Sequence, residues 1–255
     1  MKIIDLSKPI QYNSKDPRFM RVKIKHKAHR KARWLVRLFG LPFRLFPKKF
    51  KGWADDEIRK MGVHSTTHLD APWHYGPECM GQPAKTIDQV PLEWCYGDGL
   101  VIDMRHKADY DAITVEDIKK ALQKNRLELK PEMIVLIQTG RDALMGTPDF
   151  FKRGTGMSAE ATIWLIDQGI RVMGIDQWGW DLPLPYQMEQ AKKINDPELF
   201  WEAHLVGIDR EYCHMEQLTN LDKLPKSGFK IAVFPLKIVG GSAAPARVVA
   251  LLEEE

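Results

Sequence analysis

The sequence predicts an α/β fold, because segments typical of helices alternate with segments typical of strands. Residues 133–139 (MIVLIQT) are a short apolar run that ends at a glycine, as buried strands do. Residues 158–169 then have a helical pattern, and residues 170–176 (IRVMGID) form a second apolar run. Helices between strands indicate a layered α/β structure. With 255 residues, 44% of them hydrophobic, we predict a single domain over 1–255.

Three helices are expected, and each begins at a residue that can cap it. The predicted helices and their N-caps are 114–125 with Thr114, 158–169 with Ser158, and 196–207 with Asp196. Gly169 and Gly207 are expected to end the second and third helices.

Two strands are expected near the C-terminus, over residues 229–239 and 246–254. Pro235 inside the first predicts an edge or a bulge there, since proline cannot donate to a sheet. The segment 76–99 is rich in proline and glycine and is expected to be an irregular loop near the site or a subunit contact.

Charge is unevenly distributed along the chain. Residues 21–51 hold twelve Lys and Arg and no acid, so the remainder carries a net charge of −8 against +4 for the whole. We predict that 21–51 is a basic arm or lid that packs on its own or a neighbouring subunit. Contact with an anionic membrane surface is a second interpretation. Nucleic-acid binding has support only from this arm, and we do not predict it.

The remaining chain-wide features favour a cytoplasmic protein. No run of about 18 apolar residues could span a membrane. Residues 1–10 lack the apolar core of a secretory signal. Cys79, Cys95 and Cys213 form no CxxC pair and are expected to be reduced and packed, without a catalytic role.

Residues 64–74 (HSTTHLDAPWH) contain three of the eight histidines and an aspartate. His64 and His68 have the spacing of a HExxH zinc helix, but Ser65 replaces the glutamate and Pro72 disfavours a helix. A metal site on a turn-to-strand segment fits better. Histidines that are simply hydrogen-bonded remain the alternative.

In such a segment, His68 and Asp70 point the same way because they are two residues apart in an extended chain. His64 can join them if the chain curls at residues 65–67. Imidazole and carboxylate suit Zn²⁺, and also Mn²⁺ or Fe²⁺. His74, beyond Pro72, is free to transfer protons at neutral pH.

The pattern His-x-x-Thr-His-x-Asp-x-Pro-x-His resembles the signature of the metal-dependent cyclase/hydrolase family, which includes bacterial kynurenine formamidase, isatin hydrolase and some lactone hydrolases. Thr66 stands where the family usually has glycine. Residues 4–10, 156–176 and 235–251 are similar to other segments of the family, so the resemblance covers nearly the whole chain. It implies a mixed, barrel-like central sheet flanked by helices.

The resemblance also implies the rest of the site. The family has a histidine followed twelve residues later by a glutamate, here His204 and Glu216. One metal would bind His64, His68 and Asp70, and a second would bind Asp70, His204 and Glu216. His214 is placed outside this set. One or two zinc ions per chain are expected, with manganese as the alternative.

This site predicts hydrolysis of a small amide or cyclic amide, with His74 moving the proton. A lactone hydrolase is the second hypothesis, and a metal-containing binding protein without catalysis is the third. Trp73, Trp178 and Trp180 are predicted to contact an aromatic substrate, and arginines of the arm would favour a carboxylate-bearing one. A homodimer or homotetramer is expected from the resemblance.

Overall fold

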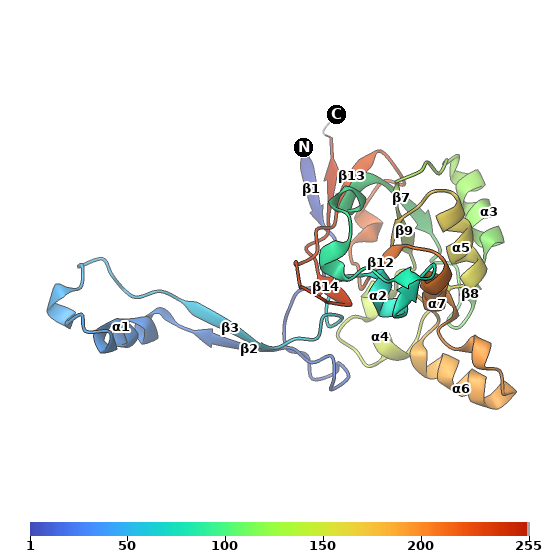
Figure 1. The fold of residues 1–255 in the computed structure, drawn as a ribbon. Helices are drawn as coiled ribbons and strands as arrows, with labels where there is room; N and C mark the ends of the chain where they lie inside the picture. The colour runs from blue at the N-terminus through green and yellow to red at the C-terminus, as the bar shows by residue number, and fades with distance from the viewer. Residues whose placement is uncertain (254–255) are drawn as a thin grey trace.

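The computed structural model describes residues 1–253 and has one large mixed sheet (Figure 1). Within these residues the sheet has nine strands, in the spatial order β1 (Lys2–Asp5), β15 (Val249–Leu252), β13 (Phe229–Ala232), β7 (Tyr96–Asp103), β9 (Ile134–Gln138), β11 (Val172–Ile175), β12 (Cys213–Glu216), β4 (His68–Asp70) and β14 (Ala243–Pro245).

Helices within the body cover one side of this sheet and fill its connections. They are α2 (Pro72–Tyr75), α3 (Val115–Asn125), α4 (Asp149–Lys152), α5 (Ala159–Asp167), α6 (Leu184–Ile194) and α7 (Glu202–Asp209), whereas α1 (His29–Leu38) lies apart from the sheet. Three small strand pairs lie outside the sheet, namely β2 (Lys23–Lys27) with β3 (Asp55–Lys60), β5 (Glu78–Cys79) with β6 (Gln82–Pro83), and β8 (Ala112–Ile113) with β10 (Gly156–Met157).

The sheet is curled into a half-barrel. Its four central strands, β7, β9, β11 and β12, are parallel, and the strands on either side of them are antiparallel. The segment after edge strand β1 links distant parts of the sheet. Leu6 donates its N–H to Val248, and its carbonyl accepts from Thr219, just past β12. These contacts bend the sheet toward itself and confirm the predicted barrel-like α/β fold.

The two faces of the sheet bury different cores, because successive side chains on a strand point to opposite faces. On β9, Ile134 and Leu136 pack inside the half-barrel with Leu69. Val135 and Ile137 face the helices instead. Helices α3, α5 and α7 lie over that second face, as Figure 1 shows.

The first two predicted helices are confirmed with their caps. The Thr114 side chain accepts a hydrogen bond from the N–H of Asp117 at the start of α3. The Ser158 hydroxyl accepts from the N–H of Ala161 at the start of α5. Gly169 follows α5 with a positive φ of 86°, a conformation that favours glycine. The predicted strands at 133–139 and 170–176 correspond to β9 and β11.

The predicted third helix is wrong in its extent. Asp196 caps only a short 3-10 turn, Pro197–Leu199, and α7 begins at Glu202. Trp201 between them has a φ of 64°, which breaks the helix. Gly207 does not end α7. It lies inside the helix, where a Cβ atom would come within 2.0 Å of the Tyr75 ring.

The C-terminal strands are shorter than predicted. β13 ends at Ala232, and Pro235 forms only an isolated bridge with Ala246. Loss of the proline N–H explains this interruption. The segment 76–99 is not wholly irregular, since it contains the hairpin of β5 and β6 and the start of β7.

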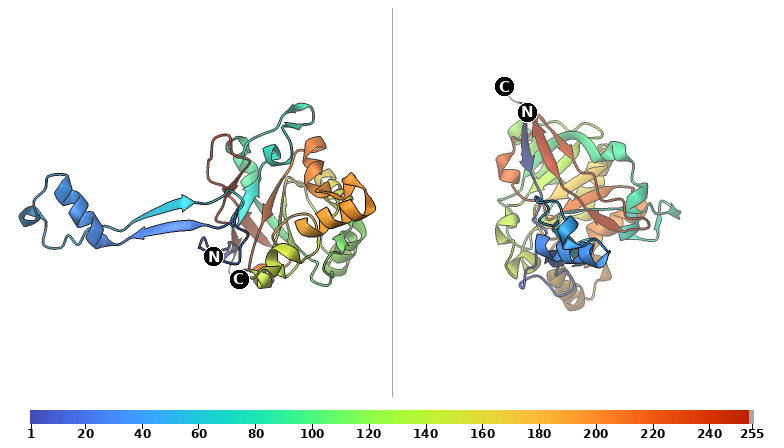
Figure 2. Two further views of the ribbon diagram at one scale, coloured as in Figure 1. Left: turned by 90° about the horizontal axis from the view of Figure 1, so that it is seen from below. Right: turned by 90° about the vertical axis from the view of Figure 1, so that its left-hand side faces the viewer.

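The basic arm projects far from the body of the domain, as Figure 1 and the left view in Figure 2 show. Strands β2 and β3 form its stem, and α1 lies toward its tip. Every residue of β3 is exposed. The arm therefore does not fold over the body of its own chain.

No helix among the described residues is long and apolar enough to cross a membrane. The three cysteines are free and buried, and burial raises the pKa of the Cys95 thiol to about 11. The cytoplasmic location stays a prediction.

Candidate metal-dependent active site

The site is built on the pairing of β4 with β12. In this antiparallel pair His68 lies opposite Glu216, and Asp70 lies opposite His214. Directly opposed residues project to the same face of a sheet. Leu69 and Met215 alternate with them and enter the apolar core. Because side chains alternate along each strand, the polar side chains of the site lie on one face and the apolar core residues on the other.

His64 and His68 form an outer group around one oxygen of Asp70. The Nδ1 atom of His64 lies 2.9 Å from Asp70 Oδ1, and the Nε2 atom of His68 lies 3.2 Å from it. The Nδ1–H of His68 donates to the carbonyl of Thr66 at 2.7 Å, which leaves Nε2 free to bind a metal. His64 is about a quarter exposed, whereas His68 is fully buried.

The hydroxyls of the motif hold this outer group in place. Thr66 donates its hydroxyl to the carbonyl of Lys8, and Thr67 donates to the carbonyl of Gln217. The motif is thereby tied both to the N-terminal segment and to the end of β12. Thr66, which stands where the family usually has glycine, therefore fits the turn because its hydroxyl has a hydrogen-bond partner.

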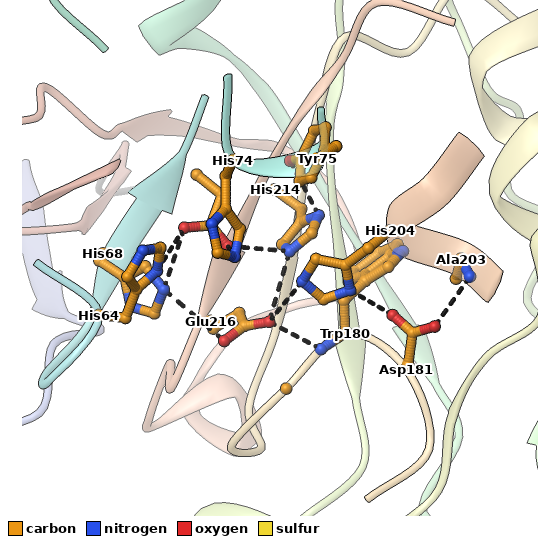
Figure 3. Close-up of polar contacts among 12 residues, drawn as sticks. His64, His68, His74, Tyr75, Trp180, Asp181, Ala203, His204, His214 and Glu216 are labelled. Carbon is orange, nitrogen blue, oxygen red and sulfur yellow. Dashed lines mark hydrogen bonds and ion pairs between the residues drawn. The ribbon is translucent and has the colours of Figure 1, made fainter. Parts of the chain in front are cut away.

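His204, His214 and Glu216 lie close together (Figure 3). With the other oxygen of Asp70 they form an inner group. The Nε2 atom of His214 lies 3.2 Å from Asp70 Oδ2 and 3.4 Å from Glu216 Oε1. The Nε2 atom of His204 lies 3.6 Å from Glu216 Oε1. All three side chains are at most 9% exposed.

The inner group is oriented by three further residues. Nδ1–H of His204 donates to the Asp181 carboxylate, which also accepts from the N–H of Ala203. The backbone N–H of Trp180 donates to Glu216 Oε1 at 2.9 Å. Asp181 was not among the predicted site residues, and its contact with His204 could be found only once the fold was known.

His214 was expected to be a bystander, and its position contradicts that expectation. It occupies the same face of β12 as Glu216, two residues away, and its ring nitrogen reaches both carboxylates. The spacing of His214 and Glu216 could have indicated this position. In a strand, residues at i and i+2 share a face, so His214 and Glu216 project to the same side of β12.

The donor atoms fit a divalent metal. Six buried side-chain atoms within residues 1–253 have no hydrogen-bond partner, and four of them belong to this cluster: His68 Nε2, both Asp70 carboxylate oxygens and His214 Nε2. Native proteins seldom leave such atoms unpaired. Imidazole and carboxylate atoms that converge without hydrogen bonds are the donor set of a metal site.

His74 differs from the other histidines. It lies in the short helix α2, whose first residue is Pro72. The Nε2 atom of His74 lies 4.0 Å from Asp70 Oδ2. Burial lowers the pKa of His74 to about 4, against the raising effect of Asp70. Its imidazole is therefore neutral at pH 7 and can accept a proton. For Asp70, burial opposes ionisation, yet contact with His68, His74 and His64 lowers its pKa well below the usual value.

A cavity of about 420 Å³ opens beside the cluster. That volume lies within the range of small-molecule sites, about 300–1,000 Å³. Its lining is mostly apolar and aromatic: Phe19, Met20, Gly62, His64, His74, Trp178, Gly179, Asp181, Leu182, Leu184, Gln187, Phe200, Trp201, His204 and Glu216.

Only one of the three predicted substrate-contacting tryptophans lines this cavity. Trp178 does so, whereas Trp73 is 43% exposed and lies outside the lining. Trp180 is fully buried and stacks on His214 with ring centroids 5.1 Å apart, so its ring supports the site from behind. Trp201 lines the cavity instead and stacks on His204 at 4.5 Å. Trp201 was not predicted to contact substrate, because a continuous helix was expected over residues 196–207.

The family model described as "Putative cyclase" matches residues 4–182. The chain belongs to the cyclase family. This match spans most of the chain and includes the motif at 64–74, so the cyclase-family resemblance predicted from that motif is confirmed.

Several named relatives of this cyclase-family chain are isatin hydrolase or kynurenine formamidase enzymes. An isatin hydrolase from Roseibium aggregatum is 29% identical over 204 residues, which is 75% of this chain and 73% of the relative. A kynurenine formamidase from Bacillus cereus is 23% identical over 205 residues, covering 80% and 83% of the two chains. A solved isatin hydrolase, bound to the product analogue thioisatinate, has the same fold with a TM-score of 0.73 at 22% identity, covering 99% and 93%. The relatives support a hydrolase.

Proposed function

We propose that this protein is a metal-dependent hydrolase that cleaves the C–N bond of a small aromatic amide or cyclic amide. The observation that carries the proposal is the convergence of unpartnered His and carboxylate atoms beside a cavity that also contains His74. The names of the relatives, isatin hydrolase and kynurenine formamidase, support the amide class.

Asp70 is the natural bridge between two metal positions. Its Oδ1 faces His64 and His68, and its Oδ2 faces the inner group. Zinc suits this mixture of imidazole and carboxylate, and manganese is the second candidate. When bound, such a metal supplies a water activated at neutral pH and polarises the carbonyl of the substrate.

His74 is the residue proposed to move the proton. It lines the cavity, is neutral at pH 7 and is 23% exposed on its side chain. It would accept a proton from the attacking water and donate it to the leaving nitrogen. Its ring lies 4.2 Å from that of His64, so the proton carrier adjoins the outer group.

The lining favours an uncharged aromatic substrate. Trp178, Trp201 and Phe200 supply aromatic surface. Among the described residues that line the cavity, none is a lysine or an arginine. Arg21, at the start of the arm, donates to the carbonyls of Ser14 and Asp16 and does not line the cavity, and α1 lies far from the body (Figure 1). Isatin, an aromatic cyclic amide, matches this description.

Hydrolysis assays test the proposal directly. Full-length protein loaded with zinc or manganese is mixed with isatin, an aryl formamide and an aryl lactone, and hydrolysis is followed by absorbance. We expect turnover of an amide that is lost in His74→Gln and kept in His106→Gln, a control because His106 is exposed. Turnover of the lactone alone would replace the amide assignment with the lactone hypothesis. Retention of metal without turnover of any substrate would favour the binding protein.

We propose further that the arm packs against a second copy of the chain. Trp34, Leu38 and Phe39 are exposed on it by 61–80%, an unusual amount of apolar surface. An isolated two-stranded hairpin is also marginally stable by itself. The net charge of −8 outside residues 21–51 complements the basic arm.

Molecular mass in solution tests this assembly. The full chain should be a homodimer or homotetramer by light scattering, and replacement of residues 29–50 by a short Gly-Ser loop should yield a monomer. An unchanged mass after the replacement would exclude the arm as the contact. Binding of a monomeric full chain to anionic lipid vesicles would support the membrane interpretation instead.

A further inference from the structure

The position of His214 points to a ligand set larger than the one predicted. Its Nε2 atom is fully buried and has no hydrogen-bond partner among the described residues. It approaches Asp70 Oδ2 at 3.2 Å and Glu216 Oε1 at 3.4 Å. We infer that His214 is a fourth protein ligand of the inner metal position, which is thereby closed, while the outer position stays open. This inference rests on the proposed metal dependence.

The separations between donor atoms match a tetrahedral site. Bonds of about 2.0–2.2 Å from zinc to nitrogen and oxygen place tetrahedral ligand atoms roughly 3.3–3.6 Å apart. The three measured separations within the inner group and Asp70 are 3.2, 3.4 and 3.6 Å. One donor atom from each of Asp70, His204, His214 and Glu216 lies within 4.8 Å of the others. Four protein donors are therefore close enough together to bind one ion.

The His214 ring is held in the orientation that a ligand requires. It is stacked between Trp180 and Tyr75, with centroid distances of 5.1 and 5.3 Å. Its Nδ1 lies 3.1 Å from the Tyr75 hydroxyl. In the neutral tautomer Nδ1–H donates to that hydroxyl, and the Nε2 lone pair is then directed at the two carboxylates.

Packing beneath Tyr75 shows that this support is built into the fold. Tyr75 stacks on Tyr212 at 4.9 Å. Gly207 provides the space for Tyr75, since a Cβ atom there would lie 2.0 Å from the ring. The glycine inside α7 thus contributes to the position of His214 through Tyr75.

A direct ion pair is the competing explanation. A protonated His214 could sit between the two carboxylates and take the place of the inner metal. The ring nitrogen, however, makes a hydrogen bond of acceptable geometry to neither oxygen. With Nδ1–H directed at the Tyr75 hydroxyl, the lone pair of a neutral His214 faces two carboxylates, and a cation held between the three groups would satisfy all of them.

A closed site and an open site differ in how they hold their metals. Four protein ligands leave no coordination position for water, which is typical of structural zinc. The outer group has only His64, His68 and the shared Asp70, and His64 is 26% exposed, whereas no inner side chain is more than 9% exposed. The inner metal should therefore be released slowly and the outer one readily.

Zinc release from the zinc-loaded full chain to a coloured chelator tests the inference. The wild type should hold two zinc ions and release them in one fast and one slow phase. His214→Phe keeps an aromatic ring between Tyr75 and Trp180 and should lose the slow phase. Tyr75→Phe should accelerate the slow phase by roughly 10–100-fold, the usual effect of removing a hydrogen bond to a metal-bound histidine. His106→Gln serves as the control.

Cobalt provides a second measurement if His214→Phe fails to fold. The first equivalent bound by the wild type should give the strong visible absorption of four-coordinate cobalt, and Tyr75→Phe should bind it more weakly. Equal slow phases in the wild type and both variants would overturn the inference and leave the proposed function standing. The inference would also be overturned if the wild type binds a single metal ion and only His68→Ala loses it. A wild type that binds no metal would overturn the proposed function itself.

Discussion

The outer and inner groups share one carboxylate, Asp70, but lie in different surroundings. His64 is 26% exposed, whereas His214 is completely buried and His204 is 5% exposed, although His204 and Glu216 also line the cavity. The inner side chains are held by Asp181, Tyr75 and a backbone N–H. Under the proposed metal dependence, the difference teaches that one cluster can divide its tasks, with metal retained on the inner, more buried side (the dry side) and water admitted on the outer, open side.

Removal of the Asp70 carboxylate, which the inner and outer groups share, should have the largest effect on metal content and activity. In Asp70→Asn a neutral amide replaces the oxygens that face both groups, so both metal positions should be lost. Loss of several kcal/mol of transition-state stabilisation corresponds to a decrease in kcat/KM of about 10³-fold or more. Elemental analysis and the hydrolysis assay check this. Full activity with normal metal content would contradict the bridging role.

Substitution of His74 should affect the open side alone. His74→Gln removes the proton carrier but none of the ligands of the inner group. Loss of general acid–base catalysis should lower kcat by roughly 10²–10⁴-fold. Metal content, measured on the same sample, should be unchanged. If zinc is lost together with activity, His74 is a ligand and not a proton carrier.

Substitution of Asp181 should affect the dry side alone. Asp181→Asn weakens the hydrogen bond that orients His204. A change in such a supporting residue costs about 10–100-fold in metal affinity. Competition with a chelator of known affinity measures the effect. Excess metal should restore most of the activity, which would not happen if Asp181 took part in the chemistry.

The smallest effect is expected at the wall of the cavity. Trp178→Leu should raise KM for an aromatic amide by about 2–10-fold, because an aromatic contact contributes roughly 0.5–1.5 kcal/mol. Trp73→Leu is the matched control, since Trp73 is exposed outside the lining. Equal KM values for the two variants would remove Trp178 from the substrate site.

Much of the fold could be predicted from local patterns. The capping residues Thr114 and Ser158 correctly placed α3 and α5, and the apolar runs placed β9 and β11. The break at Trp201 could not be predicted, because its left-handed conformation is imposed by the surrounding structure.

The site was predicted in the parts that one short motif encodes. His64, His68, Asp70 and His74 come together as the motif indicates. The i, i+2 spacing of His214 and Glu216 shows that they share a face of β12, but the approach of His214 to Asp70 depends on the pairing of β12 with β4, strands more than 140 residues apart. Residues 21–51 were predicted to be an arm or lid that packs on its own or a neighbouring subunit; within this chain the arm projects from the body, and packing on a neighbouring subunit stays a prediction.

A titration of the metal-free protein tests the central claim most directly. Zinc or manganese is added in fractions of one equivalent per chain, and hydrolysis of isatin is measured at each step. The first equivalent should fill the closed inner position with little activity, and the second should fill the open position and bring activity to its maximum. Full activity after one equivalent, with no further binding, would contradict the division between the inner and outer groups.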